Sequence, residues 1–327
     1  DGLFNDNINF LNPEDIESME ILKDPSSLAI FGVRGANGVI IITTKKAKEG
    51  QTLVNINTSF GFKKVVDKVD LVNGPQFQEL YSEQLANQKD TPFDFSGWNA
   101  NTNWQDEIFR NASMHNHQIN ISGGNEGTTY SLSGGYLSQD GIGIGSSFER
   151  FSARMNSDYN LIGKFLTIGE HFTLNRTSEV QAPGGFLQNV LQFNPSLPVY
   201  DINGEYAGPV GGYPDRENPV ARLDRNSDNR YTYWRMFGDA YINLNPFKGF
   251  NVRSTFGLDY AQKSQRIFTY PITEGNVAND KNAVEAKQEH WTKWMWNAIA
   301  TYNLEIGKHR GDAMVGMELN RDDDINF

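Results

Sequence analysis

The dominant pattern in this chain is the alternation of apolar and polar side chains along repeated segments. Between Thr52 and Lys63, for example, Val54, Ile56 and Phe60 alternate with small polar residues. A period of two is that of a β-strand with one apolar face and one polar face. Eight further segments share the pattern, so the sequence predicts about nine strands, at 52–63, 117–123, 128–138, 148–161, 165–176 and 230–244, and from residues 252, 294 and 313 onward.

The connections between these strands alternate regularly between short and long. Short connections fall at 125–127, 162–164, 245–249 and 306–309, and long ones at 64–114, 139–147, 177–229 and 262–288. Transmembrane β-barrels have short turns at the periplasmic end and long loops at the extracellular end. A soluble sandwich has no such difference between its two ends. The fold class predicted is therefore mostly β, an antiparallel transmembrane β-barrel of which the chain supplies about nine strands.

The long connections carry structure of their own. The segment Gly74–Gln88 places Phe77, Leu80 and Tyr81 at helical spacing, which predicts a helix. A short helix is predicted near Phe186–Phe193, and a hairpin turn at the Asn203-Gly204 pair. The second connection, 139–147, is read as a loop that holds Gly141, Gly143 and Gly145, and the last, 262–288, as a polar loop.

The segment from Asn12 to Lys46 departs from the alternating pattern and reads as a small folded unit. Asn12 and Pro13, followed by acidic residues, are typical of a helix start. Pro25 predicts a short helix that follows it, over Ser26–Ile30. The unbroken β-branched run from Val39 to Thr44 predicts a strand buried on both faces.

This segment resembles the end of the plug domain in TonB-dependent outer-membrane transporters, specifically the SusC/RagA-like group. The matching strings are NPEDIES, LKD and GVRGANGVI followed by ITTKK, and we call Asn12–Lys46 the plug-like segment. Pro25, after Asp24, departs from the small residue that is more frequent there in the family. The residues that carry the resemblance are Asn12, Pro13, Asp15, Ile16, Lys23, Asp24, Gly32, Arg34, Gly35, Ala36, Asn37, Gly38, Thr43 and Thr44.

The resemblance implies a domain organisation. Residues 1–50 would be the C-terminal part of an α/β plug domain, and residues 51–327 the first part of a barrel with long extracellular loops. The family has a plugged barrel of 22 strands, so nine strands would be its first two-fifths. The chain also opens in the middle of a pattern, which predicts a piece of a longer precursor.

The resemblance also implies a function. SusC/RagA-like transporters import oligosaccharides, or less often peptides, across the outer membrane of Bacteroidetes-type Gram-negative bacteria. The expected partners are a SusD-like surface lipoprotein, the TonB energy-coupling system, the oligosaccharide or peptide substrate and the outer-membrane lipid. Two alternatives stay open, namely a TonB-dependent siderophore or cobalamin receptor, and an envelope β-protein that binds or adheres without transport.

Composition narrows the function classes. The chain of 327 residues has no cysteine, which excludes disulfides and cysteine-based metal sites within it. Its net charge of −11 argues against nucleic acid as a partner. It contains no apolar run long enough for a transmembrane helix, whereas barrel strands need only about nine to eleven residues.

No catalytic or cofactor site is predicted, so the protein is not expected to be an enzyme. The glycines around Gly35 match neither a dinucleotide fingerprint nor a P-loop. His115 and His117 share a strand face, but no third metal ligand accompanies them. Asp224 begins a calcium-loop-like string, whose sixth position lacks glycine and whose twelfth lacks glutamate. The prediction is therefore no cofactor and no metal.

Residues for transport are sought on the polar strand faces and in the long loops. We expect the strand residues to contact the plug or to line the substrate path. The alternative is that they are ordinary hydrated residues of the lumen or pack against the plug. The two tryptophans of the first loop could stack on sugar rings, and the alternative is loop packing. The candidates are Arg235, Asp239, Asn243, Arg253 and Asp259 on the strands, and Trp98 and Trp104 in the loop.

Overall fold

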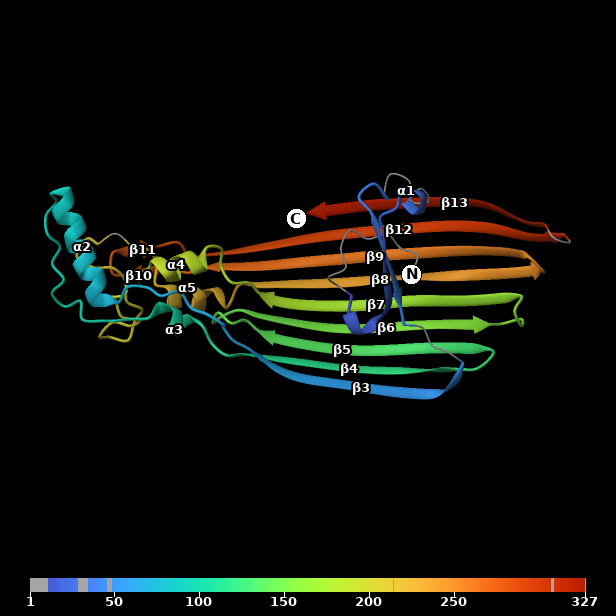
Figure 1. Cartoon of the computed structure of the whole chain (residues 1–327), viewed down its shortest axis with the longest axis horizontal. Helices are drawn as coiled ribbons and strands as arrows, with labels where there is room; N and C mark the ends of the chain where they lie inside the picture. The colour runs from blue at the N-terminus through green and yellow to red at the C-terminus, as the bar shows by residue number, and fades with distance from the viewer. Residues whose placement is uncertain (1–10, 29–34, 46–48, 214, 307–308, 327) are drawn as a thin grey trace.

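The computed structural model of the chain describes residues 11–28, 35–45, 49–213, 215–306 and 309–326. Its main feature is a nine-stranded antiparallel sheet in which each strand pairs with its neighbour in the sequence (Figure 1). This confirms the prediction of a mostly β wall of about nine strands. The strands are β3 (Gly50–Lys63), β4 (Ala112–Gly124), β5 (Thr128–Asp140), β6 (Ser147–Asn160), β7 (Leu166–Val180), β8 (Arg230–Phe247), β9 (Phe250–Thr269), β12 (Ala283–Ile306) and β13 (His309–Asn326).

The two ends of the sheet differ as the connection lengths predict. Tight turns close one end, and the long connections gather at the other, at the left of Figure 1. In the turn between β4 and β5, the Asn125 side chain accepts hydrogen bonds from the backbone N–H groups of Gly127 (2.8 Å) and Thr128 (2.9 Å). Such side-chain turns need few residues, so the neighbouring strands stay in register.

The two faces of the sheet have opposite chemistry. One face, which we call the outward face, leaves large apolar side chains exposed, among them Phe60 (66%), Phe256 (49%) and Trp234 (43%). The other, the inward face, buries polar and charged side chains such as Arg154 and Asp239. A row of exposed apolar side chains opposite a buried polar face is the reverse of a soluble protein, and it fits a wall between lipid and a polar lumen.

The outward apolar band has the height of a bilayer core. On β8 the outward positions from Trp234 to Leu244 carry no polar side chain. At roughly 3.3 Å per residue and a strand tilt of roughly 40°, these positions span about 25 Å along a barrel axis. On β7 the band includes the charged Glu170, whose carboxylate accepts a hydrogen bond from the Ser157 hydroxyl. Rings occur at both edges of the band, with Trp234 at one and Phe247, stacked on Phe250, at the other.

The plug-like segment forms a separate two-stranded sheet. Asn12 caps a single 3₁₀ turn, Pro13–Asp15, by accepting the N–H of Glu14 at 3.2 Å. The expected helix ends there, because the chain continues as β1 (Ile16–Leu22), which pairs antiparallel with β2 (Val39–Thr44). Backbone pairing to a β-branched strand outweighs the helix-start signal. A four-residue helix, α1 (Pro25–Leu28), follows β1 and overlaps the helix predicted over Ser26–Ile30, whose last two residues lie outside the described residues.

The strand β2 is present, but the prediction that it is buried on both faces is wrong. Thr44 is its one buried residue, and Ile40 is half exposed. Gly38, just before β2, has φ +92°, and its N–H donates to the Gly35 carbonyl at 2.9 Å. An L-residue at Gly38 would be strained, which explains a glycine at this turn. Gly32 and Arg34, also part of the family signature, lie outside the described residues.

The long connections pack together into one unit at the left of Figure 1, which we call the loop module. Its apolar core is a cluster that includes Trp104, Ile108, Val190 and Leu223. The elements are α2 (Gly74–Gln88), α3 (Trp104–Ile108), α4 (Phe186–Gln192), α5 (Pro219–Asn226), β10 (Ile272–Glu274) and β11 (Val277–Asn279). The helices α2 and α4 confirm the sequence prediction, whereas α5 was not predicted.

The last long connection is shorter than predicted. The expected polar loop at 262–288 is mostly strand, because β9 continues to Thr269 and β12 starts at Ala283. Only the small hairpin β10–β11 separates them. Beyond the membrane both faces of a strand meet water, so apolar and polar positions no longer alternate and the sequence pattern disappears.

Candidate functional site

The candidate site is the inward face of β4–β6, where the plug-like segment lies. Asp15 is at its centre, at the end of the 3₁₀ turn. Its carboxylate accepts hydrogen bonds from the Ser133 hydroxyl (2.9 Å) and the Gln118 amide (3.2 Å). Gln118 in turn accepts from the Asn12 side chain at 2.6 Å. These contacts join residues more than a hundred positions apart, and they fix the 3₁₀ turn on the sheet.

Burial controls the protonation of Asp15. Removal from water raises the pKa of this carboxyl, against the opposing effects of the Ser133 hydrogen bond and of the positive charges of Arg154 and Lys45. Burial disfavours the charged form of a carboxyl, whereas hydrogen bonds and cations favour it. The charged state of Asp15 therefore depends on its contacts with the sheet.

A second set of contacts holds the other end of the plug-like segment. The Arg154 guanidinium on β6 donates to the hydroxyls of Thr44 (2.5 Å) and Thr173 (2.9 Å). The Asn156 amide donates to the Lys45 carbonyl at 3.0 Å. Arg154 and Asn156 are two residues apart on one strand, so both face inward toward the end of β2.

The inward face continues past the plug-like segment as a line of paired polar and charged side chains. On β7 and β8, His171 Nδ1 lies 3.1 Å from the Asp239 carboxylate, and both side chains are buried. On β8 and β9, the Arg235 guanidinium forms a two-pronged contact with Asp259, with Nε–Oδ1 at 2.8 Å and a second contact at 2.6 Å. Burying charges in pairs avoids the cost of an isolated buried charge.

The strand residues selected from the sequence therefore lie on the inward face, as their polar alternation predicts. Within the sheet, Arg235 pairs with Asp259 and Asp239 with His171. The expectation that the selected strand residues contact the plug or line the substrate path stays a prediction. Asn243 accepts from Asn251 at 2.7 Å, and Arg253 lies over the Tyr241 ring at 3.7 Å. Asp239 acts on the contact region indirectly, through its attraction to Arg154.

The side chains that do hold the plug-like segment were not selected from the sequence. They are Gln118, Ser133, Arg154 and Asn156, on three neighbouring strands. Their inward direction was readable from the alternation. Their partners were not, because nothing in the sequence states where the plug-like segment lies on the sheet.

Several signature residues of the plug-like segment have structural roles. The Asp24 carboxylate accepts the N–H of Ser27 at 3.2 Å and so caps α1. Thr43 pairs with Ser18, and Ile16 with Thr44, in the β1–β2 ladder. Pro13 begins the 3₁₀ turn, Ala36 and Asn37 form the turn before Gly38, and Lys23 links β1 to α1.

Both tryptophans of the first loop belong to the core of the loop module. Trp98 is 7% exposed and Trp104 is 3% exposed. The Trp104 indole N–H donates to the Asn194 carbonyl at 3.0 Å, and its ring meets Phe193 edge-on. This is the loop-packing alternative, and it corrects the expectation that these rings offer a face to a sugar.

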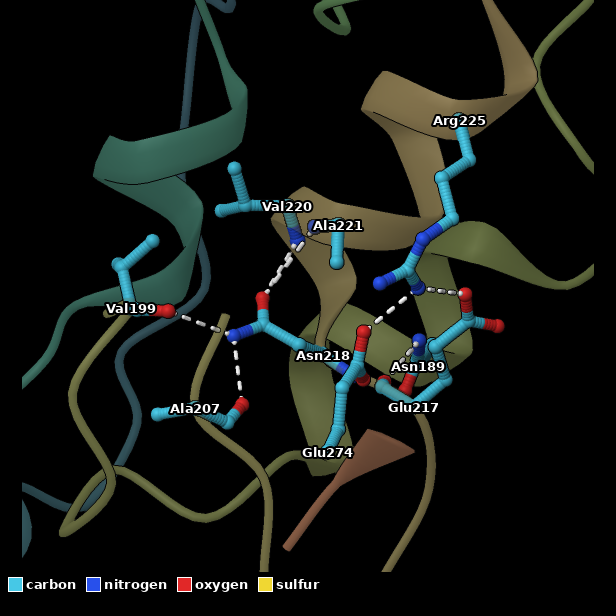
Figure 2. A network of polar contacts seen from close by, with 9 residues as sticks. All are labelled: Asn189, Val199, Ala207, Glu217, Asn218, Val220, Ala221, Arg225 and Glu274. Atoms are coloured by element: carbon cyan, nitrogen blue, oxygen red, sulfur yellow. Dashed lines mark hydrogen bonds and ion pairs between the residues drawn. The ribbon is translucent and has the colours of Figure 1, made fainter. Parts of the chain in front are cut away.

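A buried polar network locks the loop module (Figure 2). Asn218 caps α5 by accepting from Val220 N–H, and its amide donates to the carbonyls of Val199 (2.9 Å) and Ala207 (2.8 Å). Its own N–H donates to the Glu274 carboxylate at 2.8 Å, and Arg225 pairs with the same carboxylate at 2.5 Å. One asparagine thus connects a helix, two loop segments and the β10–β11 hairpin.

The histidine pair and the calcium-loop-like string, both rejected as metal sites from the sequence, lie outside the candidate site. His115 and His117 pack against Phe60 on the outward face. Asp224 and Asn226 are part of α5 rather than of a calcium loop. No helix in the described part of the chain is long and apolar enough to cross a membrane.

The fold and this site define a class of protein: a wall of a transmembrane β-barrel with a small plug-like sheet seated on its polar face. Comparison with known proteins then names the group. TonB-dependent receptor P3 of Formosa agariphila is 33% identical over 310 residues, which cover 91% of this chain. TonB-dependent receptor SusC of Bacteroides thetaiotaomicron is 30% identical over an alignment of 343 residues, gaps included, which covers 95% of this chain. The chain is thus similar over nearly its whole length to SusC-type TonB-dependent receptors, and the resemblance drawn from the plug-like segment is confirmed.

Solved structures agree on the fold. The RagAB peptide transporter matches 95% of this chain with a TM-score of 0.74 at 22% identity, and its open-open state matches 96% with 0.73 at 20%. The chain spans only 30% and 33% of the length of the two curated relatives, and 39% of the RagAB transporter chain. No known protein-family model matches the chain.

Proposed function

We propose that the chain is part of a TonB-dependent transporter that imports oligosaccharide or peptide nutrients across the outer membrane of a Bacteroidetes-type bacterium. Residues 1–50 would then be the end of the plug and residues 51–327 the first part of the barrel wall. The protein acts in this proposal as a transporter and not as an enzyme. The relatives named TonB-dependent receptors support the proposal.

The observation that carries the proposal is the seating of the plug-like segment on the inward face. Among the described residues, at least five side-chain hydrogen bonds join it to the sheet, at Asn12, Asp15, Thr44 and Lys45. At roughly 1 kcal/mol net per hydrogen bond, they contribute about 5 kcal/mol. Hydrogen bonds of this total strength would hold the plug-like segment in the barrel at rest. A mechanical pull on the segment could still break them, because water then replaces the lost partners.

Import through such a wall needs an external source of work, because the outer membrane holds no ATP or ion gradient. Substrate capture at the loop end would favour displacement of the plug-like segment, and a periplasmic pull by the TonB system would complete it. The loop module lies at the end with long connections, which is the extracellular end in membrane barrels (Figure 1). A SusD-like lipoprotein would hold substrate above it.

The direct test uses the complete reading frame from which this chain comes. We expect its deletion to abolish growth on one class of oligosaccharide or peptide as sole carbon source, and growth on free monosaccharide to be unchanged. Loss of growth only under iron or cobalamin limitation would instead support the siderophore or cobalamin alternative. Unchanged uptake of every solute, together with lost surface binding, would support the envelope-adhesion alternative.

The partner proposal has its own test. We expect a gene for a SusD-like lipoprotein beside this reading frame, and co-purification of that lipoprotein with the tagged receptor from outer membranes. Purification of the receptor alone, from membranes in which the lipoprotein is present, would contradict the partnership.

A further inference from the structure

An uncompensated pair of arginines lies on the outward face, above the apolar band. Arg230 on β8 and Arg266 on β9 are direct cross-strand partners. Like charges directly opposite each other in a sheet destabilise it. In the part of the chain that the structure describes, neither guanidinium has an ion-pair partner, and Arg230 makes one long hydrogen bond, 3.4 Å, to Ser178.

The arginine pair borders a cavity of about 720 Å³ that opens on this face. Thr232 and Ser264, another cross-strand pair, lie directly below the arginines and face the same way, and Gln288 extends this row. The cavity thus has two cations just below Asp228 and Phe268 at its upper edge, and hydroxyl and amide groups on its wall below the arginines. A negative group with several acceptor oxygens would satisfy both, whereas an apolar or cationic ligand would satisfy neither.

The charged side chains around the cavity do not cancel the positive charge of the two arginines. Lys287 lines it too, but its ammonium pairs with Glu289 at 2.5 Å. The Asp228 carboxylate at the rim accepts a hydrogen bond from the Tyr270 hydroxyl at 2.6 Å. The whole chain has a net charge of −11, so this pair of adjacent arginines is opposite in sign to the chain as a whole.

The height of the cavity identifies the source of the anion. Trp234 marks the upper edge of the apolar band, in a cross-strand row that also holds Tyr136 and Phe151. Arg230 lies four residues farther along β8, about 10 Å higher along a tilted strand. Lipid headgroups occupy roughly 5–8 Å on each side of the hydrocarbon core, which an arginine side chain at this height reaches by bending toward the membrane. Arginine side chains in this layer reach phosphate groups.

We propose that Arg230 and Arg266, with Thr232, Ser264 and Gln288, form a binding site for the phosphate group of an anionic lipid in the outer leaflet. This inference rests on the proposed membrane orientation and adds a lipid ligand to it. The two guanidiniums bind the phosphate from two strands, and the hydroxyls and the amide donate to its remaining oxygens. The bound lipid then relieves the repulsion between the two arginines.

The test is native mass spectrometry of the complete receptor, purified in detergent and titrated with phosphatidylglycerol or phosphatidylcholine. We expect tighter binding of phosphatidylglycerol, weakened about tenfold in an Arg230→Gln, Arg266→Gln double variant, because two charge-assisted contacts are lost. The matched control is Lys248→Gln with Arg310→Gln, which removes two charges beside the tight turns and should leave binding unchanged. Replacing both arginines by lysine should retain part of the preference, since the charge stays and the planar fork is lost.

Each other outcome has a defined meaning. Equal phosphatidylglycerol binding by wild type and the double glutamine variant would overturn the proposal, and so would equal weakening by the control. Full competition by millimolar inorganic phosphate would identify a free anion as the ligand and overturn the lipid assignment. Heat-dependent migration in SDS gels checks that every variant forms a barrel. A wild-type receptor that never inserts into a membrane would instead refute the proposed function.

Discussion

Asn218 provides the sharpest test of how the loop module is held together. Its side chain is fully buried, caps α5 and donates to two carbonyls in the preceding loop (Figure 2). In Asn218→Ala, loss of the cap costs about 0.5–2 kcal/mol. Each buried carbonyl left without a donor costs about 1–3 kcal/mol. Because neighbouring losses are not additive, we expect a total of about 3–6 kcal/mol.

Limited proteolysis of the complete receptor in outer-membrane vesicles measures how often the loop module opens. At tenfold per 1.4 kcal/mol, the open population of the loop module rises by about 10²–10⁴-fold, and cleavage within 181–229 accelerates accordingly. Asn203→Ala is the matched control, since Asn203 lies exposed at a hairpin tip in the same connection. We expect the control to change cleavage less than about threefold.

The aspartate variant separates the two roles of Asn218. Asn218→Asp keeps the oxygen that caps α5 but cannot donate to the carbonyls of Val199 and Ala207. We therefore expect it to be cleaved much faster than wild type. Wild-type resistance in Asn218→Asp, or equal cleavage of Asn218→Ala and the Asn203→Ala control, would refute the network.

Three further predictions concern other buried groups. Trp104→Ala should destabilise the loop module by about 3–5 kcal/mol, which limited proteolysis would detect as faster cleavage in the absence of substrate. If this variant instead binds substrate more weakly while its loop module stays protease-resistant, the packing role is refuted. Asp259→Asn leaves the buried Arg235 without its carboxylate and should lower the heat-modification temperature, whereas Arg235→Met with Asp259→Leu should restore it. Burial raises the pKa of Glu274, so the folded loop binds this proton more tightly than the unfolded chain. The protease resistance of wild type relative to Glu274→Gln should therefore fall as pH rises from about 4.5, and a pH-independent ratio would contradict this.

The strands of the barrel wall can be predicted well from the sequence, because side chains along a membrane strand must alternate between lipid-facing and lumen-facing positions. Trp234 and Ile242 face outward and Arg235 and Asp239 face inward, as their spacing predicts. The same rule fails at 262–288, where both strand faces meet water. A different rule fails in β1, because pairing to β2 outweighed the helix-start signal at Asn12.

The site was harder to predict than the wall. Asn218-Pro219 is the same cap-and-proline signal that marks α2 at Asn73, so α5 could have been found from the sequence. The contacts of Asp15 and Arg154 could not, because they depend on where the plug-like segment lies on the sheet. Such placement is a long-range property that local patterns do not encode.

The most direct test of the account is to fix the plug-like segment to the wall. The Ser133 hydroxyl lies 2.9 Å from the Asp15 carboxylate, and this chain has no native cysteine. We would introduce Asp15→Cys and Ser133→Cys in the complete receptor, join the thiols with a short reducible cross-linker, and measure nutrient uptake by cells. Uptake should stop on cross-linking and recover on reduction, while each single variant transports throughout. Undiminished uptake by the fully cross-linked receptor would contradict displacement of this segment during transport.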